Sequence, residues 1–155
     1  MNTESDRHRP SGPAANRKRA ALKAICQQHG VAILYSFGSR ARETLAWLDD
    51  PKAVLTPGPS DVDLGVKPLP ATDFNRKTEV VLELALEGFL GVESVVLVNL
   101  QCADPFFAFE VIKGERLYAE SEYSADNYDL YIMAQVGDLT YLKEVTEPLL
   151  FGVPK

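Results

Sequence analysis

Two aspartates lie two positions apart in the segment 60–64 (SDVDL), in which polar and apolar residues alternate. This alternation is typical of a strand, and side chains two apart on a strand point to the same face. Asp61 and Asp63 would therefore lie close together and repel each other unless a cation sits between them. Carboxylate oxygens are the ligands that Mg²⁺ prefers, usually together with substrate phosphates. The pair predicts a metal site for a phosphorylated substrate, and a solvated loop edge is the alternative.

A second feature is the dipeptide Gly38-Ser39, which follows the apolar run 31–37 (VAILYSF). A short apolar run that ends at a glycine predicts a buried strand, here followed by a helix. Glycine at such a junction lets a phosphate approach the backbone, and the free N–H groups of a helix start favour an anion. Because an ordinary turn has the same sequence, this dipeptide is informative only in combination with the two aspartates.

Together these segments resemble a known family. Residues 34–42 (LYSFGSRAR) followed by 60–64 resemble the minimal nucleotidyltransferases (MNT) of the DNA polymerase β superfamily, small proteins usually paired with a HEPN-domain toxin. The resemblance continues through residues 103–112 to Gly114 and Leu117-Tyr118, and so covers about residues 20–120. It implies a polymerase β-like nucleotidyltransferase fold, an α/β domain with a small mixed sheet flanked by helices.

The resemblance also implies roles for individual residues. Gly38 and Ser39 would hold the β- and γ-phosphates of ATP, while Asp61 and Asp63 would ligate Mg²⁺, in a two-metal site if the protein is active. An acceptor hydroxyl, in this family a tyrosine of the HEPN-type toxin, would attack the α-phosphate and receive AMP as pyrophosphate leaves. Arg42 is expected to reach the phosphates, and a solvated position or an ion pair with a nearby carboxylate is the alternative.

The sequence departs from the family pattern at one position. The neighbouring strand of the family supplies a third carboxylate, and this chain has Val96 there. Losing a positioned general base typically costs about 10²- to 10⁴-fold in rate. Glu93 is the carboxylate nearest to that position, but it lies three residues earlier and would substitute only through a bulge or a register shift.

Two functions follow from these observations. The first is an Mg²⁺-dependent nucleotidyltransferase that modifies its HEPN-type partner and acts as the antitoxin of the pair. The second is a catalytically impaired MNT-like antitoxin or regulator that acts by binding its partner. The acidic segment 120–147 suits a basic partner surface, and an ordinary solvated helix face is the alternative. The sequence is also compatible with a homo-oligomer.

Charge and composition narrow the function classes further. The chain has 155 residues and a formal charge of −6, but residues 1–23 carry six basic and two acidic residues, which leaves −10 for residues 24–155. This excess of acidic residues over positions 24–155 argues against a broad surface that binds nucleic acid. The chain has neither an apolar stretch long enough to cross a membrane nor a secretory signal, so a cytoplasmic location is expected.

The remaining pattern predicts a flexible arm over residues 1–16 and a single domain over residues 17–150. Ser39 and Thr72 are expected to cap helices that end near Leu48 and Leu90. In the second of these helices the expected buried side chains include Phe74, Val81, Leu84 and Phe89. The segment 47–59 is longer than the usual family connection, and its sequence does not decide whether it lengthens a helix, covers the nucleotide or contacts a partner. Helices are expected over residues 17–30, 39–48, 72–90, 105–114 and 125–145, and strands over 31–37, 61–66, 92–100 and 117–118.

Overall fold

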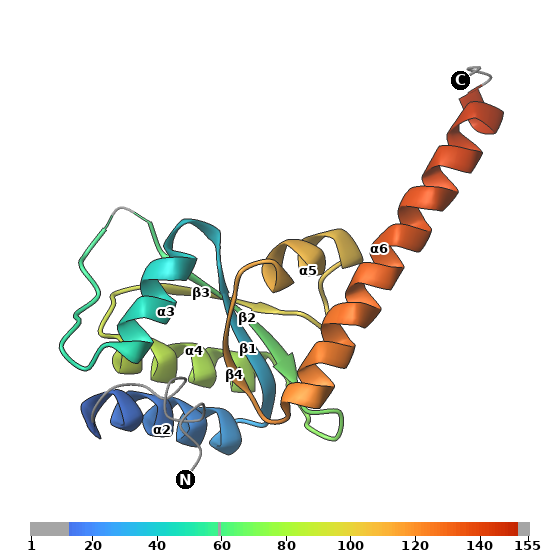
Figure 1. Ribbon diagram of the computed structural model, residues 1–155. Helices are drawn as coiled ribbons and strands as arrows, with labels where there is room; N and C mark the ends of the chain where they lie inside the picture. The colour runs from blue at the N-terminus through green and yellow to red at the C-terminus, as the bar shows by residue number, and fades with distance from the viewer. Residues whose placement is uncertain (1–12, 59, 152–155) are drawn as a thin grey trace, which may run out of the picture.

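The computed structural model describes residues 13–58 and 60–151. Its four strands form one sheet in the order β3-β2-β1-β4, with helices on both faces (Figure 1). The bounds of the elements, in chain order, are α2 (Pro13–Gln28), β1 (Val31–Phe37), a 3-10 turn (Gly38–Arg40), α3 (Ala41–Asp49), β2 (Val62–Pro68), α4 (Arg76–Leu90), β3 (Val95–Asn99), α5 (Pro105–Ile112), β4 (Glu115–Ala119) and α6 (Glu122–Phe151).

The sheet is mixed, as the sequence predicted. β1 pairs antiparallel with both β2 and β4, while β2 pairs parallel with β3. Side chains of β1 belong to both hydrophobic cores, so both of its faces are covered, which explains why its sequence is an almost unbroken apolar run. One core lies between the sheet and α2, α3 and α4, and the other between the sheet and α5 and α6. Representative residues of the two cores are Leu22, Leu34, Leu48, Leu64 and Leu86, and Ile33, Tyr35, Val111, Ala125 and Ile132.

Both predicted helix caps were wrong. Ser39 lies inside the 3-10 turn, and α3 begins only at Ala41. α4 begins at Arg76, where the side chain of Asn75 accepts a 2.9 Å hydrogen bond from the backbone N–H of Thr78. Thr72 instead packs against the backbone of Gly30, where a Cβ atom would lie 2.6 Å from the Thr72 hydroxyl. Tertiary packing thus outweighs the local capping preference of Thr72.

The buried face of α4 also differs from the prediction. Val81 and Leu84 are 46% and 62% exposed, whereas the buried side chains are spaced four apart, at Leu82, Leu86 and Leu90. Phe74 and Phe89 are half-buried and pack against the core. The prediction erred because α4 carries apolar residues on both faces, so that the period alone does not determine which face is inside.

The ends of the chain differ from the predicted bounds as well. Residues 13–16, which the sequence assigned to the arm, belong to α2, and residues 1–12 lie outside the described part of the chain. α6 begins at Glu122 and continues to Phe151, so that its outer half extends beyond the sheet (Figure 1). Among the described helices, none is long and apolar enough to cross a membrane.

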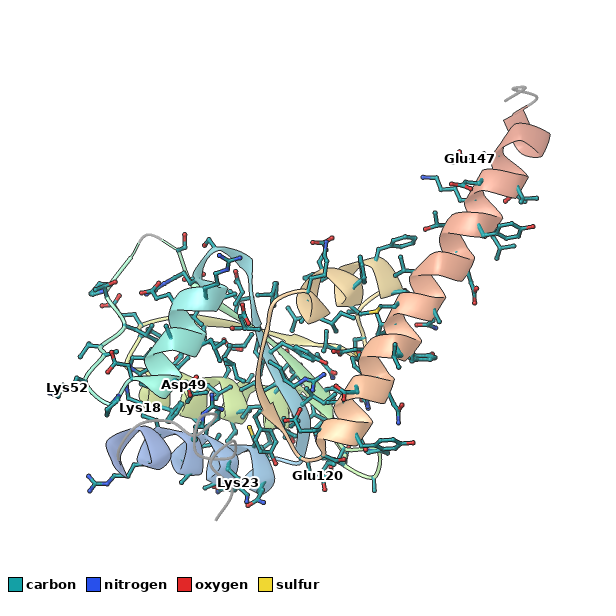
Figure 2. All side chains as sticks on the ribbon, viewed as in Figure 1. Lys18, Lys23, Asp49, Lys52, Glu120 and Glu147 are labelled. Atoms are coloured by element: carbon teal, nitrogen blue, oxygen red, sulfur yellow. The ribbon has the colours of Figure 1, made fainter. Side chains whose placement is uncertain are left out.

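The connection after α3 is tied to α2 by one lysine. The Lys18 Nζ atom donates to the carbonyl oxygens of Trp47, Asp50 and Ala53 at 2.9, 2.7 and 3.0 Å. The same ammonium lies 4.1 Å from the centroid of the Trp47 ring, which is itself buried against Phe89. Figure 2 shows Lys18 close to Asp49 at the end of α3. The start of the segment 47–59 is therefore part of the packed domain.

We expect the Gly114→Ala substitution to lower the free energy of unfolding by about 2–3 kcal/mol, because the structure leaves no room for a methyl group there. A Cβ atom at Gly114 would overlap the carbonyl oxygen of Ser36 and lie 3.0 Å from Phe37 Cα. Both neighbours are backbone atoms of β1, which cannot move aside.

The matched control for this prediction is Gly88→Ala. A Cβ atom at Gly88, inside α4, meets no heavy atom within 4 Å. Alanine should therefore stabilise the protein by about 0.5–1 kcal/mol through its better helix propensity. Urea unfolding of both variants measures the two effects, and equal midpoints would contradict the packing argument.

Candidate functional site

The turn after β1 brings a glycine against a carboxylate. Gly38 has a φ of 76°, in the left-handed region that favours glycine. Phe37 pairs with Asp63 across the antiparallel β1–β2 ladder, so that the turn begins directly beside Asp63. A Cβ atom at Gly38 would lie 2.5 Å from Asp63 Oδ2. The backbone conformation therefore favours glycine here, and a side chain at this position would displace the Asp63 carboxylate.

Two buried hydroxyls hold this turn, and sequence reasoning missed both. The Ser36 Oγ atom donates to the carbonyl of Ala41 at 3.0 Å, and the Thr44 Oγ1 atom donates to the carbonyl of Arg40 at 2.8 Å. Both side chains are almost fully buried. The only sequence signal was the polar residue at the end of an otherwise apolar strand.

Asp61 and Asp63 are brought together as their spacing predicted. Asp63, on β2, is half-buried, while Asp61 immediately precedes the strand and is exposed. Burial, and then the negative charge of Asp61, raise the pKa of Asp63. A cation between the two carboxylates would remove this repulsion and favour the ionised form of both. The pair is therefore suited to a divalent ion that also binds substrate phosphates.

The strand register identifies the neighbour of Asp63. In the parallel β2–β3 pair, Asp63 lies opposite Val96, whose side chain is 40% exposed. The valine thus occupies the position on the adjacent strand from which a third carboxylate would reach the same ion. The described part of the chain contains no group of three His, Cys, Asp or Glu side chains placed to hold a metal. This donor set fits one Mg²⁺ shared with a nucleotide better than a two-metal site.

Glu93 reaches the neighbourhood of Asp61 from the segment that precedes β3. It is exposed and lines, with Arg40, Ser60 and Asp61, a hollow of about 300 Å³. The β2–β3 register is continuous from Val62 opposite Val95 to Val66 opposite Asn99. The strand pair therefore contains no bulge that would bring Glu93 onto the face shared by Asp63 and Val96.

A second hollow, of about 400 Å³, adjoins the Gly38 turn. Gly38, Ser39 and Arg42 line it together with Lys113, which sequence reasoning missed. Arg42 is exposed, and Lys113 Nζ lies 2.8 Å from Glu110 Oε1. Asp63 lies close to Gly38, which lines this hollow, and the negative charge of Asp61, which lines the first hollow, acts on it. Glu110 and Glu115 also line this hollow, so a phosphate would compete with Glu110 for Lys113, whereas Arg42 and the glycine turn lie next to the carboxylate pair.

Arg40 has a structural role, in contrast to Arg42. Its side chain donates to Glu43 Oε1 and Oε2 at 2.9 and 3.0 Å, and to the carbonyls of Thr56 and Ser60 at 2.6 and 3.3 Å. Only 8% of the residue is exposed. Because Ser60 immediately precedes Asp61, Arg40 fixes the path by which the chain enters the carboxylate pair.

We expect Arg40→Ala to lower the free energy of unfolding by about 2 kcal/mol, since it leaves two carbonyls and Glu43 without their donor. Arg76→Ala is the matched control. Arg76 also pairs with a glutamate three residues later, at 2.9 Å, but its side chain is 78% exposed. This loss should be within about 0.5 kcal/mol. Thermal unfolding of both variants measures the difference, and equal losses would refute the role given to Arg40.

Comparisons with known proteins agree with this geometry. The chain matches the family model described as "Polymerase beta, Nucleotidyltransferase" over residues 20–123. No curated protein matches the chain. Among solved structures, a toxin–antitoxin with AMP-PNP is 15% identical, with a TM-score of 0.61, over 86% of this chain and 98% of that one. A tri-AMPylated Shewanella oneidensis HEPN toxin in complex with MNT antitoxin is 14% identical, with a TM-score of 0.58, over 88% and 98%.

At these identities the solved structures establish a common fold. The family match is broader evidence, because it extends from α2 through β4 and into the start of α6, over well more than half of the chain. It includes Gly38, Ser39, Asp61 and Asp63, the residues that the β1 turn and the β2 start bring together. This chain belongs to the polymerase β nucleotidyltransferase family.

Proposed function

We propose that this protein is an MNT-type antitoxin that binds Mg²⁺-ATP and transfers AMP to a tyrosine of a HEPN-domain toxin. The observation that carries the proposal is the placement of Asp63 close to both the Gly38 turn and Asp61. The structures with the same fold support it, since one contains AMP-PNP and another a tri-AMPylated HEPN toxin with its MNT antitoxin.

Different residues of the site would hold the metal ion and the phosphates of the nucleotide. Asp61 and Asp63 would hold Mg²⁺, which when bound neutralises charge on the triphosphate. Gly38 admits the phosphate chain to the backbone, and the Ser39 hydroxyl donates a hydrogen bond to it. Arg42 and Lys113, on the hollow beside this turn, offset the remaining negative charge.

In the transfer, one bond to the α-phosphorus forms and another breaks. The acceptor oxygen bonds to the α-phosphorus, the bond from that phosphorus to the bridging oxygen breaks, and pyrophosphate leaves. The acceptor must also lose its proton, and Val96 offers no base beside Asp63. A tyrosine, whose pKa is about 10, needs less assistance than an aliphatic alcohol. A phenolic acceptor is therefore the one that this site suits best.

Val96 also favours a second function, that of a catalytically impaired antitoxin or regulator that acts by binding. The site then has two carboxylates instead of three, and the described residues supply no third ligand. Nucleotide binding would persist in this case, because Gly38, Ser39, Asp61 and Asp63 are all present.

One experiment separates the two functions. The full chain is mixed with a co-produced HEPN-domain protein, labelled ATP and Mg²⁺, and AMP addition is followed by radiolabel and intact mass. An active family member serves as the positive control and a chelator as the negative control. Label on the HEPN protein supports transfer, whereas a stable complex without label supports the binding function. Absence of both label and complex would contradict both functions.

A further inference from the structure

The long helix α6 has a second apolar surface that the domain does not use. Its inner side packs against the sheet and α5 through Ala125 and Ile132, which are buried, and through Tyr128. Seven other large apolar side chains on the helix are 45–78% exposed. We refer to six of them, all except Met133, as the outer stripe: Tyr123, Leu130, Tyr131, Tyr141, Leu142 and Val145.

The spacing of the outer stripe shows that it follows one side of the helix. Leu130, Tyr141 and Val145 lie 7, 18 and 22 residues after Tyr123, close to two, five and six helical turns. A helix that is apolar on two sides is normally buried on both. Tyrosine is also enriched among the side chains that dominate binding energy at protein interfaces.

The outer half of α6 lacks support from the rest of the domain. Every residue from 137 to 147 is exposed. The labelled Glu147, near the outer end, lies far from the other labelled residues (Figure 2). Helical segments this short are marginally stable in water unless they pack against something. Packing of another surface against the outer half would therefore stabilise it.

The charges on α6 favour a different protein over a second copy of this chain as the partner of the outer stripe. Asp138 lies within the outer stripe and Glu144 beside it, and no cation of the described residues is within salt-bridge distance of either. The nearest basic residue on the helix, Lys143, lies 3.8 Å from Glu147 instead. Pairing with a second copy would bring these carboxylates together, in a chain whose residues 24–155 already carry −10. A partner with lysine or arginine beside its apolar surface avoids this repulsion.

We propose that the outer stripe of α6 is the docking surface for a helix of another protein, with an apolar ridge flanked by basic side chains. The proposal rests on the partner class given under the proposed function, and it does not depend on AMP transfer. It assigns binding to a surface that lies on α6, away from the β1 turn and the carboxylate pair.

The test uses the full chain and a co-produced HEPN-domain protein as the probe, with affinity measured by calorimetry. The stripe variant is Tyr141→Gln/Leu142→Gln/Val145→Gln, and the control is Thr140→Gln/Thr146→Gln on the same helical segment but off the stripe. All five positions are exposed, so the domain should fold in both variants. We expect the stripe variant to bind at least about 30-fold more weakly and the control to bind like the wild type.

A charge reversal separates a basic partner from a second copy. Asp138→Lys should weaken binding to the HEPN-domain protein, whereas it would strengthen self-association. Hydrogen exchange should show slow amides over residues 138–147 only in the complex. Unchanged affinity of the stripe variant, no complex with the wild type, or a wild-type dimer that the stripe variant dissolves would each overturn the proposal. Stripe-dependent binding without AMP transfer would leave it standing and contradict only the catalytic proposal.

Discussion

Replacing Asp63 with asparagine is expected to reduce AMP transfer by about 10²- to 10³-fold, the effect of losing several kcal/mol of metal-mediated stabilisation. The Asp63 carboxylate lies against the Gly38 turn, and the negative charge of Asp61 acts on it, so it is close to both candidate phosphate-binding and metal-binding residues. Asparagine keeps the shape of the side chain but not its charge. Mg²⁺-dependent ATP binding, measured by calorimetry, should weaken as well.

The same substitution should stabilise the protein in the absence of nucleotide. Burial and the charge of Asp61 raise the pKa of Asp63 in the folded state, so ionisation of Asp63 opposes folding as the pH rises above the pKa of the unfolded chain. Asparagine removes this cost. The Tm of Asp63→Asn should therefore exceed that of the wild type at pH 7, and the difference should disappear as the pH falls toward 3, where Asp63 is protonated in both states.

The combination of higher stability and lost activity is the signature that identifies a binding-site carboxylate. Adding Mg²⁺ and ATP should raise the Tm of the wild type and leave the variant nearly unchanged. Asp73→Asn, which changes an exposed loop carboxylate, is the control and should behave like the wild type. A variant that loses stability as well as binding would show that Asp63 serves the fold instead.

The sequence predicted the parts of the fold that are dictated by local pattern. The bounds of β1 were predicted without error, because the two glycines that flank its apolar run mark where the strand begins and ends. The start of α5 was also predicted, because Pro105 favours the first helical turn, and Asp104 caps it by accepting from the N–H of Phe107 at 3.0 Å. The caps at Ser39 and Thr72 failed because contacts distant in sequence compete with the local preference.

The candidate site divides in the same way. Strand spacing predicted that Asp61 and Asp63 share a face, and counting along the chain placed Val96 beside them. Lys113 and the Arg40 contacts were not predictable, because they depend on how α5 and the connection after α3 fold back onto the β1 turn. Nothing local distinguishes Arg40, which is buried, from Arg42, which is exposed and lines the hollow beside the Gly38 turn.

Introducing a carboxylate at position 96 tests directly whether the missing third carboxylate limits AMP transfer. Val96 lies opposite Asp63 on the adjacent parallel strand and is 40% exposed, so aspartate fits there without burial of its charge. We expect Val96→Asp to raise AMP transfer by about 10²- to 10⁴-fold, the range of a positioned general base, provided that the rest of the site is intact. A third carboxylate could also help Asp61 and Asp63 to hold a divalent ion.

The control is Val96→Asn, which matches aspartate in size and polarity but lacks its charge and basicity. Three neighbouring carboxylates repel one another, so Val96→Asp should unfold at a lower temperature than Val96→Asn without metal and regain the difference when Mg²⁺ is added. If both variants fold and bind ATP but show no AMP transfer, the missing base is not what limits transfer. The binding function then explains the protein better than the transferase function does. If only the aspartate variant gains activity, Val96 alone separates this protein from an efficient transferase.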